Sequence, residues 1–283
     1  MINYSKPIIV IAGPTASGKS SLAIKLAKDI NGYIVNADSR QVYKELKIGT
    51  AQPTPEIVKD SVWYIEGIKH YLYGHVSAKE RYNLYEYQQE VQTVLNKESG
   101  IPILVGGTGL YIDSVVYNYK LKKSENRDTE YSREELEKMS VKELQAKLDK
   151  ETLGKLNESD RNNPVRLIRA VERGGVNRAK GETLNHLYTV LDIDQDKLEK
   201  RISNRVNQMI KDGLVEEVEH LRSSGFNFDI SAMNSIGYKE FEGYFEKEKT
   251  IEQVKDEIVL HTIQYSKRQQ TWFKRNKDKI KVD

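Results

Sequence analysis

Residues 13–20 read Gly-Pro-Thr-Ala-Ser-Gly-Lys-Ser, and this segment constrains the fold more than any other part of the sequence. It fits the phosphate-binding pattern G-x-x-x-x-G-K-[ST]. The β-branched run Pro7–Ala12 precedes it, and a helical pattern at Ser21–Lys28 follows it. A buried strand, a glycine-rich loop and a helix in this order are the setting in which the pattern binds phosphate. The sequence therefore predicts a P-loop at the start of a parallel α/β sheet.

The residue types in this loop suit a polyphosphate ligand. Glycines let backbone N–H groups close around phosphate oxygens, and the helix N-terminus adds partial positive charge. Lys19 supplies a point charge, and the Ser20 hydroxyl can ligate Mg²⁺. We expect Mg²⁺ as the cofactor. The predicted phosphate-binding residues are Gly13, Pro14, Thr15, Ala16, Ser17, Gly18, Lys19 and Ser20.

Strand and helix patterns continue to alternate after the P-loop. Tyr33–Asp38 and Ile101–Thr108 have the character of buried strands, and residues 84–97 have a helical pattern. A further strand pattern lies at Leu187–Ile193. This alternation is typical of a parallel sheet covered by helices.

The sequence changes character between residues 119 and 186, where it is charged, has helical patches and contains no convincing strand. After this stretch we expect one long helix over residues 196–222, capped by Asp194 or Asp196. The tail from Ile251 is helical and becomes basic. The predicted fold class is α/β, with a P-loop parallel-sheet core and basic helical tail (1–118 and 187–283) interrupted by a helical insertion domain (119–186).

Composition excludes several kinds of chemistry. The chain has no cysteine, which excludes disulfides, thiolate nucleophiles and cysteine-based zinc sites and agrees with a cytoplasmic location. The first apolar run is too short to span a bilayer, so we expect no membrane association. The formal net charge of +3 is nearly neutral, so any anionic partner must be bound by local clusters of cations.

A P-loop indicates a polyphosphate but does not identify ATP. An NTPase usually has an apolar strand that ends in an acidic metal ligand. The candidate strand here, Ile103–Val105, ends in Gly106-Gly107-Thr108 without a carboxylate. Asp38 instead closes the second strand, and strand ends on this side of an open α/β sheet face the ligand. These observations weaken the NTPase interpretation.

The ordered set of motifs resembles the tRNA dimethylallyltransferase family. The motifs follow the family's order over nearly the whole chain. Each motif except the first is weak on its own, but the ordered set is a strong signal. Two departures are His70-Tyr71, where the family has two adjacent histidines, and Ile263, where it has an arginine. The matching segments are Gly13–Ser20, Asp38–Tyr43, Ile48–Ala51, Leu104–Tyr111, Asp160 with Arg166–Glu172, Arg201–Met209, Ile236–Glu240 and Lys267–Trp272.

The resemblance implies transfer of a dimethylallyl group from dimethylallyl diphosphate to N6 of the adenosine 3′ of the anticodon (tRNA adenosine 37), with release of diphosphate. The partner is then a tRNA anticodon stem-loop, bound by the insertion at 119–186. We expect a monomer. A family arginine near the start of the insertion matches either Arg127 or Arg133.

The implied reaction needs a base and a site for the leaving group. The adenine N6 lone pair is delocalised, so a base must remove a proton as the new bond forms, and Asp38 is the candidate. Lys19, the loop amides and Mg²⁺ on Ser20 stabilise the departing diphosphate. Thr108 and Arg205 resemble family residues at this site. The predicted catalytic residues are therefore Asp38, Lys19, Thr108 and Arg205.

Most of the predicted tRNA contacts fall into three groups. Residues 38–41 are placed to meet the edge of an adenine that has left its stack. Arg166 and Arg169 share one face of an expected helix, which suits phosphate contacts or simply a solvated surface. Lys267 and Arg268 lie near Trp272, which can be a stacking platform or part of the core. The full predicted set is Asp38, Ser39, Arg40, Gln41, Thr108, Arg127, Arg166, Arg169, Lys267, Arg268 and Gln269.

Three alternatives stay open at this point. A P-loop kinase of nucleotides or small molecules would turn over ATP and need an acidic metal ligand. An isopentenyltransferase acting on free AMP would share the loop but would not need the insertion or the basic tail. A non-catalytic RNA-binding module would not need a diphosphate site beside Asp38.

Overall fold

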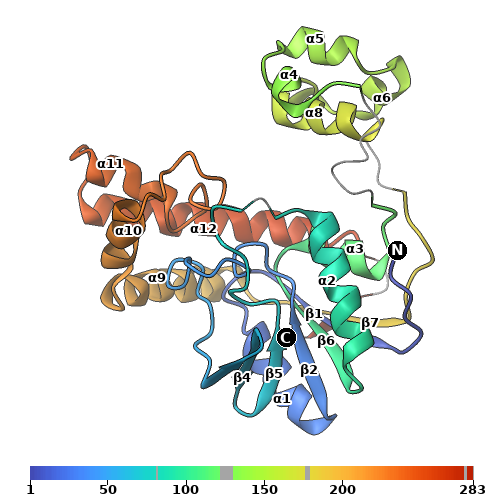
Figure 1. Cartoon of the computed structure of the whole chain (residues 1–283). Coiled ribbons are helices and arrows are strands. Elements are labelled where there is room, and N and C mark those ends of the chain that lie inside the picture. The colour runs from blue at the N-terminus through green and yellow to red at the C-terminus, as the bar shows by residue number, and fades with distance from the viewer. Residues whose placement is uncertain (81, 122–129, 176–178, 277–278, 283) are drawn as a thin grey trace. The chain divides into compact units, whose positions relative to one another are not determined.

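The computed structural model describes residues 1–80, 82–121, 130–175, 179–276 and 279–282 (Figure 1). The chain forms two compact units. The insertion unit comprises Met1 and Tyr117–Glu182, and the core unit comprises Ile2–Val116 and Thr183–Asp283. Among the described residues, none of the helices has the length and apolar character needed to cross a membrane.

The core unit is built on an eight-stranded, mostly parallel sheet in the order β3-β4-β5-β2-β6-β1-β7-β8. This architecture confirms the predicted α/β class. The strands are β1 Ile8–Ala12, β2 Gly32–Asn36, β3 Ile57–Lys59, β4 Val62–Ile65, β5 Ile68–Tyr71, β6 Ile101–Gly106, β7 His186–Leu191 and β8 Ile280–Val282. Helices of this unit are α1 Lys19–Asp29, α2 Leu84–Lys97, α3 Gly109–Val116, α9 Gln195–Lys211, α10 Leu214–Ser223, α11 Glu242–Phe245 and α12 Ile251–Phe273, with a 3₁₀ turn at Lys239–Phe241.

The register of the central strands brings three loops to one edge of the sheet. β1 lies between β6 and β7, with Ala12 opposite Gly106. β2 pairs with β6 on its other side, with Asn36 opposite Val105. Because these strands are parallel and end at the same level, the loops after β1, β2 and β6 leave the sheet side by side. Ligands bind at this edge in open α/β sheets.

The sequence analysis assigned no strand to the antiparallel edge formed by β3, β4 and β5. These strands are only three or four residues long. The two-residue turns between them, Asp60-Ser61 and Glu66-Gly67, have positive φ at both positions. That conformation matches the twist of tight hairpins and explains why so short a segment forms two of them.

The expected single helix over residues 196–222 is wrong, because the segment forms two helices. α9 ends at Lys211 and α10 begins at Leu214. Gly213 between them has φ of 98°, a left-handed conformation that a glycine adopts easily and that ends a helix. At the other end, Asp194 is the N-cap, accepting the Lys197 N–H at 3.1 Å.

A helical layer containing α9, α10 and α12 forms the second part of the core unit (Figure 1). Its interior contains Ile202 and Val206 of α9 together with Ile258 of α12, all 2% exposed or less. Tyr238 and Phe241 from the segment before α11 are fully buried in the same cluster. This packing determines which side chains of α9 and α12 are buried in the helical layer. Other side chains of both helices contribute to the functional site.

The insertion unit is a small helical body with its own core. Its helices are α4 Arg133–Glu137, α5 Val141–Ala146, α6 Lys150–Lys155, α7 Glu158–Arg161 and α8 Pro164–Arg173. Capping boxes start α4 and α5, with Ser132 and Ser140 as N-caps. Leu136, Leu144 and Leu167 are fully buried in the core of this unit. α8 is amphipathic, so its apolar face is buried while its arginines remain on the surface.

Candidate active site

The loop after β1 has the backbone shape of a phosphate cradle. Gly18, the N-cap of α1, has φ of 100°, and Ala16 has φ of 61°. Positive φ is costly for any residue with a side chain, so Ala16 keeps this conformation only because its surroundings hold it. The Ser17 N–H donates to Pro14 O at 3.3 Å, which closes the loop. The loop amides can therefore converge on an anion at the start of α1.

Lys19 folds back over its own loop. Its Nζ donates to Pro14 O at 2.6 Å. Burial of the ammonium group lowers the pKa of Lys19 to about 8, the nearby Asp38 carboxylate raises it, and Arg205 lowers it further. Burial thus makes the charge of Lys19 costly, and a bound anion would stabilise it.

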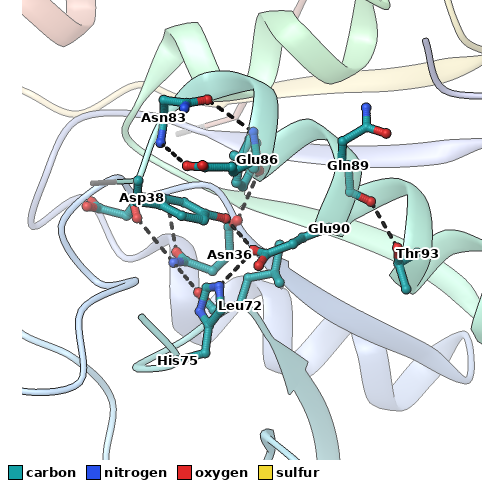
Figure 2. A network of polar contacts seen from close by, with 11 residues as sticks. Asn36, Asp38, Leu72, His75, Asn83, Glu86, Gln89, Glu90 and Thr93 are labelled. Atoms are coloured by element: carbon teal, nitrogen blue, oxygen red, sulfur yellow. Dashed lines mark hydrogen bonds and ion pairs between the residues drawn. The ribbon is translucent and has the colours of Figure 1, made fainter. Parts of the chain in front are cut away.

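The loop after β2 carries Asp38, and Asn36 fixes its backbone (Figure 2). The Asn36 Oδ1 accepts the Asp38 N–H at 2.9 Å, and its Nδ2 donates to Leu72 O at 2.9 Å. The Tyr87 hydroxyl donates to Asn36 O at 3.0 Å. Asp38 Oδ1 accepts the Arg40 N–H at 2.9 Å, which leaves the other carboxylate oxygen for a ligand. The carboxylate is therefore held at the strand end by a buried polar network.

The loop after β6 approaches the Asp38 loop closely. The Thr108 N–H donates to Ala37 O at 3.1 Å, and its Oγ1 accepts the Ser39 N–H at 3.0 Å. A Cβ at Gly106 would lie 2.1 Å from Ala37 O, so this approach requires glycine there. Although Thr108 precedes α3, its hydroxyl binds the Asp38 loop. The glycines that replace an acidic residue at this strand end thus permit close packing of the two loops.

Two arginines of α9 reach the P-loop. Arg205 Nη1 donates to Thr15 Oγ1 at 3.3 Å, and Arg201 Nη1 donates to Ser17 O at 3.4 Å. Their spacing of four residues puts both side chains on one face of α9. Together with Lys19 they concentrate positive charge where a diphosphate would lie.

Gln269 of α12, which was predicted to contact tRNA, lies between the P-loop and the end of β6. It is 4% exposed, its Oε1 accepts the Thr15 N–H at 2.8 Å, and its Nε2 donates to Gly107 O at 2.9 Å. Both ends of this buried amide are thus bound to the protein backbone. Trp272, one turn further on, donates from Nε1 to Asp113 at 3.0 Å and packs against Gly109.

The remaining predicted contacts of the Asp38 loop differ in how available they are. Gln41 Nε2 donates to Thr50 O and Ala51 O, both at 2.9 Å, so this amide nitrogen holds the following loop in place. Arg40 Nη1 donates to Ser231 O at 3.2 Å. Ser39 lies beside Thr108, with 3.3 Å between the two hydroxyl oxygens.

The cations predicted to bind tRNA phosphates lie on exposed surfaces. In the insertion unit, Arg166 forms an ion pair with Asp160, and Arg169 is exposed on α8. Arg133 pairs with both Glu137 and Glu172, which gives it a structural role. Arg127 lies outside the described residues. In the core unit, Lys267 has Glu199 at 3.7 Å, and Arg268 lies over the Tyr265 ring at 5.7 Å.

The donor set around the P-loop suits Mg²⁺ only if phosphate oxygens and water complete the coordination. In the described part of the chain no group of three His, Cys, Asp or Glu side chains could hold a metal ion. Ser20 is exposed in the first turn of α1 and offers a hard oxygen donor. Mg²⁺ commonly takes one or two protein ligands together with substrate phosphates, so these residues fit such an ion.

Sequence reasoning missed Asn36 and Tyr265. Asn36 lies two residues before Asp38 and is 1% exposed, a burial that the strand pattern alone indicates for this position. Tyr265 interacts with the side chains of Thr108 and Gln269, and these interactions lower its pKa while burial raises it to about 12. The spacing of Tyr265 and Gln269 on one face of α12 was the available signal, since residues four apart lie together on a helix.

The IPP transferase family model matches residues 41–276 of the chain. The tRNA dimethylallyltransferase of Phytoplasma australiense is 35% identical over 98% of this chain and 92% of its own length. The tRNA dimethylallyltransferase of Clostridioides difficile is 36% identical over 96% of this chain and 89% of its own length.

Solved structures show the same relationship. The tRNA isopentenylpyrophosphate transferase of Bacillus halodurans superposes with a TM-score of 0.73 at 31% identity, over 99% of this chain and 90% of the other. A eukaryotic dimethylallyltransferase acting on tRNA superposes with a TM-score of 0.76 at 27% identity, over 95% of this chain and 70% of the other.

Proposed function

The chain belongs to the IPP transferase family, and from this premise we propose that it transfers a dimethylallyl group from dimethylallyl diphosphate to N6 of an adenosine in tRNA. One observation carries the proposal. The phosphate loop after β1 and the carboxylate after β2 lie at the same edge of the sheet, and β6 between these strands ends in Gly106-Gly107 rather than in an acid. This arrangement joins a diphosphate site to a base without the acidic metal ligand of an NTPase.

The residues divide the reaction between them. Lys19, the loop amides and Arg205 hold the diphosphate and stabilise the negative charge that develops on it. Asp38 accepts the N6 proton as the N6–carbon bond forms and the carbon–oxygen bond to the diphosphate breaks. Thr108 keeps the Asp38 loop against the end of β6. The products are N6-dimethylallyl adenosine, diphosphate and one proton on Asp38.

We propose Mg²⁺ as the cofactor, with Ser20 as its protein ligand. Bound there, the ion would neutralise charge on the diphosphate oxygens. The phenols around Asp38 contribute no competing charge, because burial raises the pKa of both Tyr73 and Tyr111 and the negative charge of Asp38 raises them further. The carboxylate of Asp38 is therefore the anionic base among these neighbours.

The target nucleoside is proposed to be the adenosine 3′ of the anticodon, presented by an anticodon stem-loop. A base inside a stack cannot reach a site at the end of a sheet, so it must be turned out of the helix or loop. Arg166 and Arg169 on α8 supply cations for the RNA backbone, and Lys267 and Arg268 do so on α12. A monomer in the cytoplasm, where tRNA is found, completes the proposal.

The deciding experiment compares acceptors for one preparation of the protein. Incubation with dimethylallyl diphosphate and Mg²⁺ should prenylate tRNA, detected by mass spectrometry of digested nucleosides, and should leave free AMP unmodified. Efficient prenylation of AMP with no preference for tRNA would favour the free-nucleotide enzyme. ATP cleavage coupled to phosphorylation of a small acceptor would favour the kinase.

A further inference from the structure

Gln269 joins two of the three loops that form the site. Its side chain spans from Thr15 in the P-loop to Gly107 at the end of β6, with one hydrogen bond to each backbone. Gly107 must lack a side chain, since a Cβ there would lie 2.2 Å from Gln269 Nε2. The two loops are therefore packed around this amide, which comes from α12, 254 residues away from Thr15 in the sequence.

Tyr265 extends the connection to the third loop. Its hydroxyl interacts with the side chains of Gln269 and Thr108, and burial raises the pKa of Tyr265 to about 12, so the phenol stays neutral at physiological pH. Thr108 follows Gly107 directly in the chain and accepts the Ser39 N–H, next to Asp38. Hydrogen bonds thus connect Thr15 to Gly107 through Gln269 and connect Thr108 to Ser39, and Tyr265 interacts with both of these side chains.

The P-loop needs support at the point where Gln269 binds it. Ala16, directly after Thr15, has φ of 61°, a conformation that a residue with a side chain keeps only when its surroundings hold it. Gln269 fixes the Thr15 N–H, and Arg205 donates to the Thr15 hydroxyl at 3.3 Å. Without Gln269 the backbone beside Ala16 would lose this side-chain contact from α12.

We propose that Gln269 and Tyr265 are positioning residues that form a buried bridge between the phosphate loop and the loop that carries Asp38. The bridge holds the P-loop ready for diphosphate and couples diphosphate binding to RNA binding at Asp38. The inference rests on the proposed function. Because coupling between two binding sites is reciprocal, diphosphate should strengthen RNA binding by the same factor by which RNA strengthens diphosphate binding.

The test uses two variants and a matched control in the full chain. Gln269→Met keeps the side-chain volume and removes both hydrogen bonds, and Tyr265→Phe removes only one oxygen. Gln264→Leu changes an exposed glutamine of the same helix and serves as the control. Calorimetry measures the affinity for inorganic pyrophosphate with Mg²⁺, alone and in the presence of a tRNA anticodon stem-loop. Thermal unfolding of each variant is recorded in parallel.

We expect Gln269→Met to weaken pyrophosphate binding roughly tenfold, the loss typical when a partner that orients a binding group is removed. Its KM for dimethylallyl diphosphate should rise by a similar factor. Tyr265→Phe should leave pyrophosphate affinity without RNA nearly unchanged, abolish the strengthening by RNA and lower kcat. A residue that only stabilises the fold would lower Tm without this separation of KM from kcat.

Two results would overturn the bridge. The first is a pyrophosphate affinity of Gln269→Met equal to that of Gln264→Leu. The second is an undiminished strengthening of pyrophosphate binding by the anticodon stem-loop in Tyr265→Phe. This second result would overturn the bridge even if Gln269→Met does not fold. Pyrophosphate binding needs no prenyl transfer, so the inference and the proposed function can fail separately. Normal transfer with unaffected variants would contradict the bridge alone, whereas a wild-type protein that binds pyrophosphate but never prenylates tRNA would contradict the proposed reaction.

Discussion

The core unit and the insertion unit hold their proposed functional side chains in opposite ways. In the core unit, hydrogen bonds to loop backbone fix Lys19, Thr108 and Gln269. In the insertion unit, Arg166 and Arg169 project from the exposed face of α8, whose other face packs on a small leucine-rich core. One unit thus determines the distances between reacting groups, and the other presents charge to solvent.

This difference has an energetic consequence. Removing one partner of a buried hydrogen bond costs considerable free energy, because the other partner is left desolvated without a hydrogen bond. An exposed ion pair such as Arg166 with Asp160 contributes about 0–1 kcal/mol and is screened by salt. Substitutions in the core unit should therefore change the rate of reaction or the diphosphate affinity. Substitutions on α8 should change mainly RNA affinity and its salt dependence.

The largest expected effect follows from replacing Asp38. Asp38→Asn keeps the size of the side chain and an oxygen that can accept the Arg40 N–H, but it removes the base. Loss of a general base typically lowers the rate about a hundred- to ten-thousand-fold. Single-turnover prenylation of tRNA measures this step directly, and binding of tRNA and of pyrophosphate should change only several-fold.

Asp196→Asn is the matched control, because Asp196 is an exposed aspartate of the same unit, in the first turn of α9. A rate for Asp38→Asn above about a tenth of wild type is incompatible with the role of a general base. Equal losses for Asp38→Asn and the control would mean that the assay reports stability instead of chemistry.

Removing the positive charge of the P-loop should have the next largest effect. Lys19→Ala deletes the ammonium group of the loop, whose pKa burial lowers to about 8 while Asp38 raises it and Arg205 lowers it. We expect diphosphate affinity to fall roughly ten- to a hundredfold, because an interaction with a charged partner contributes about 1.5–3 kcal/mol. Equilibrium dialysis with pyrophosphate measures the loss. tRNA binding in the absence of diphosphate should be nearly unchanged, and a larger loss for tRNA than for pyrophosphate would contradict the assignment.

The lowered pKa of Lys19 moves the pH dependence of anion binding to a lower pH than at an ordinary lysine site. With a pKa of about 8 in the free protein, Lys19 is charged below pH 8 and neutral above it. The last proton of inorganic pyrophosphate also dissociates in the alkaline range, and this change of the ligand is the same for the wild type and for a Lys19→Arg variant. Relative to that variant, the pyrophosphate affinity of the wild type should be level below pH 8 and then fall, approaching about tenfold per pH unit.

Lys19→Arg provides the control for this titration, because arginine stays protonated throughout the range. Its pyrophosphate affinity should not fall between pH 8 and pH 9.5, even if the absolute affinity is lower than that of wild type. A wild-type profile that stays level to pH 9.5 would show that the Lys19 ammonium is not desolvated in the free protein.

The strands and helices of the core unit were easier to predict from sequence than the turns and hydrogen bonds that connect them. The strand before Gly13 and the helix after Ser20 have local signatures, namely an unbroken β-branched run and a glycine-lysine start, so both follow from neighbouring residues. The turn at Gly213 also had a local cause, the glycine itself, but the apolar periodicity of α9 and α10 continues across it and concealed the break.

The bonds that assemble the site could not be predicted in this way. Thr15 and Gln269 are 254 residues apart, and Ser39 and Thr108 are 69 residues apart. No local pattern states that a glutamine beside two cations, Lys267 and Arg268, faces inward while its neighbours face solvent. The sequence therefore predicts RNA contacts for Lys267, Arg268 and Gln269 alike. Only the packing of α12 distinguishes the buried Gln269 from the two exposed cations.

The smallest expected effects concern the insertion unit and test whether it works by charge alone. Arg169→Ala should weaken tRNA binding several-fold and reduce the slope of log affinity against log salt by about one unit, the change expected for one lost phosphate contact. Arg166→Ala should change the slope less, because Arg166 already pairs with Asp160 and must exchange that carboxylate for a phosphate. Lys267→Ala in the core unit should resemble Arg166→Ala for the same reason, with Glu199 at 3.7 Å.

Lys142→Ala, which removes an exposed cation on α5, is the matched control for lost charge. Titrations of a labelled anticodon stem-loop over a range of salt concentrations measure all four slopes. If Lys142→Ala lowers the slope as much as Arg169→Ala, the insertion attracts RNA by its overall charge and α8 has no special place in the interface. If none of the four changes the slope while pyrophosphate binding stays normal, the RNA is held by the core unit and the contrast between the two units disappears.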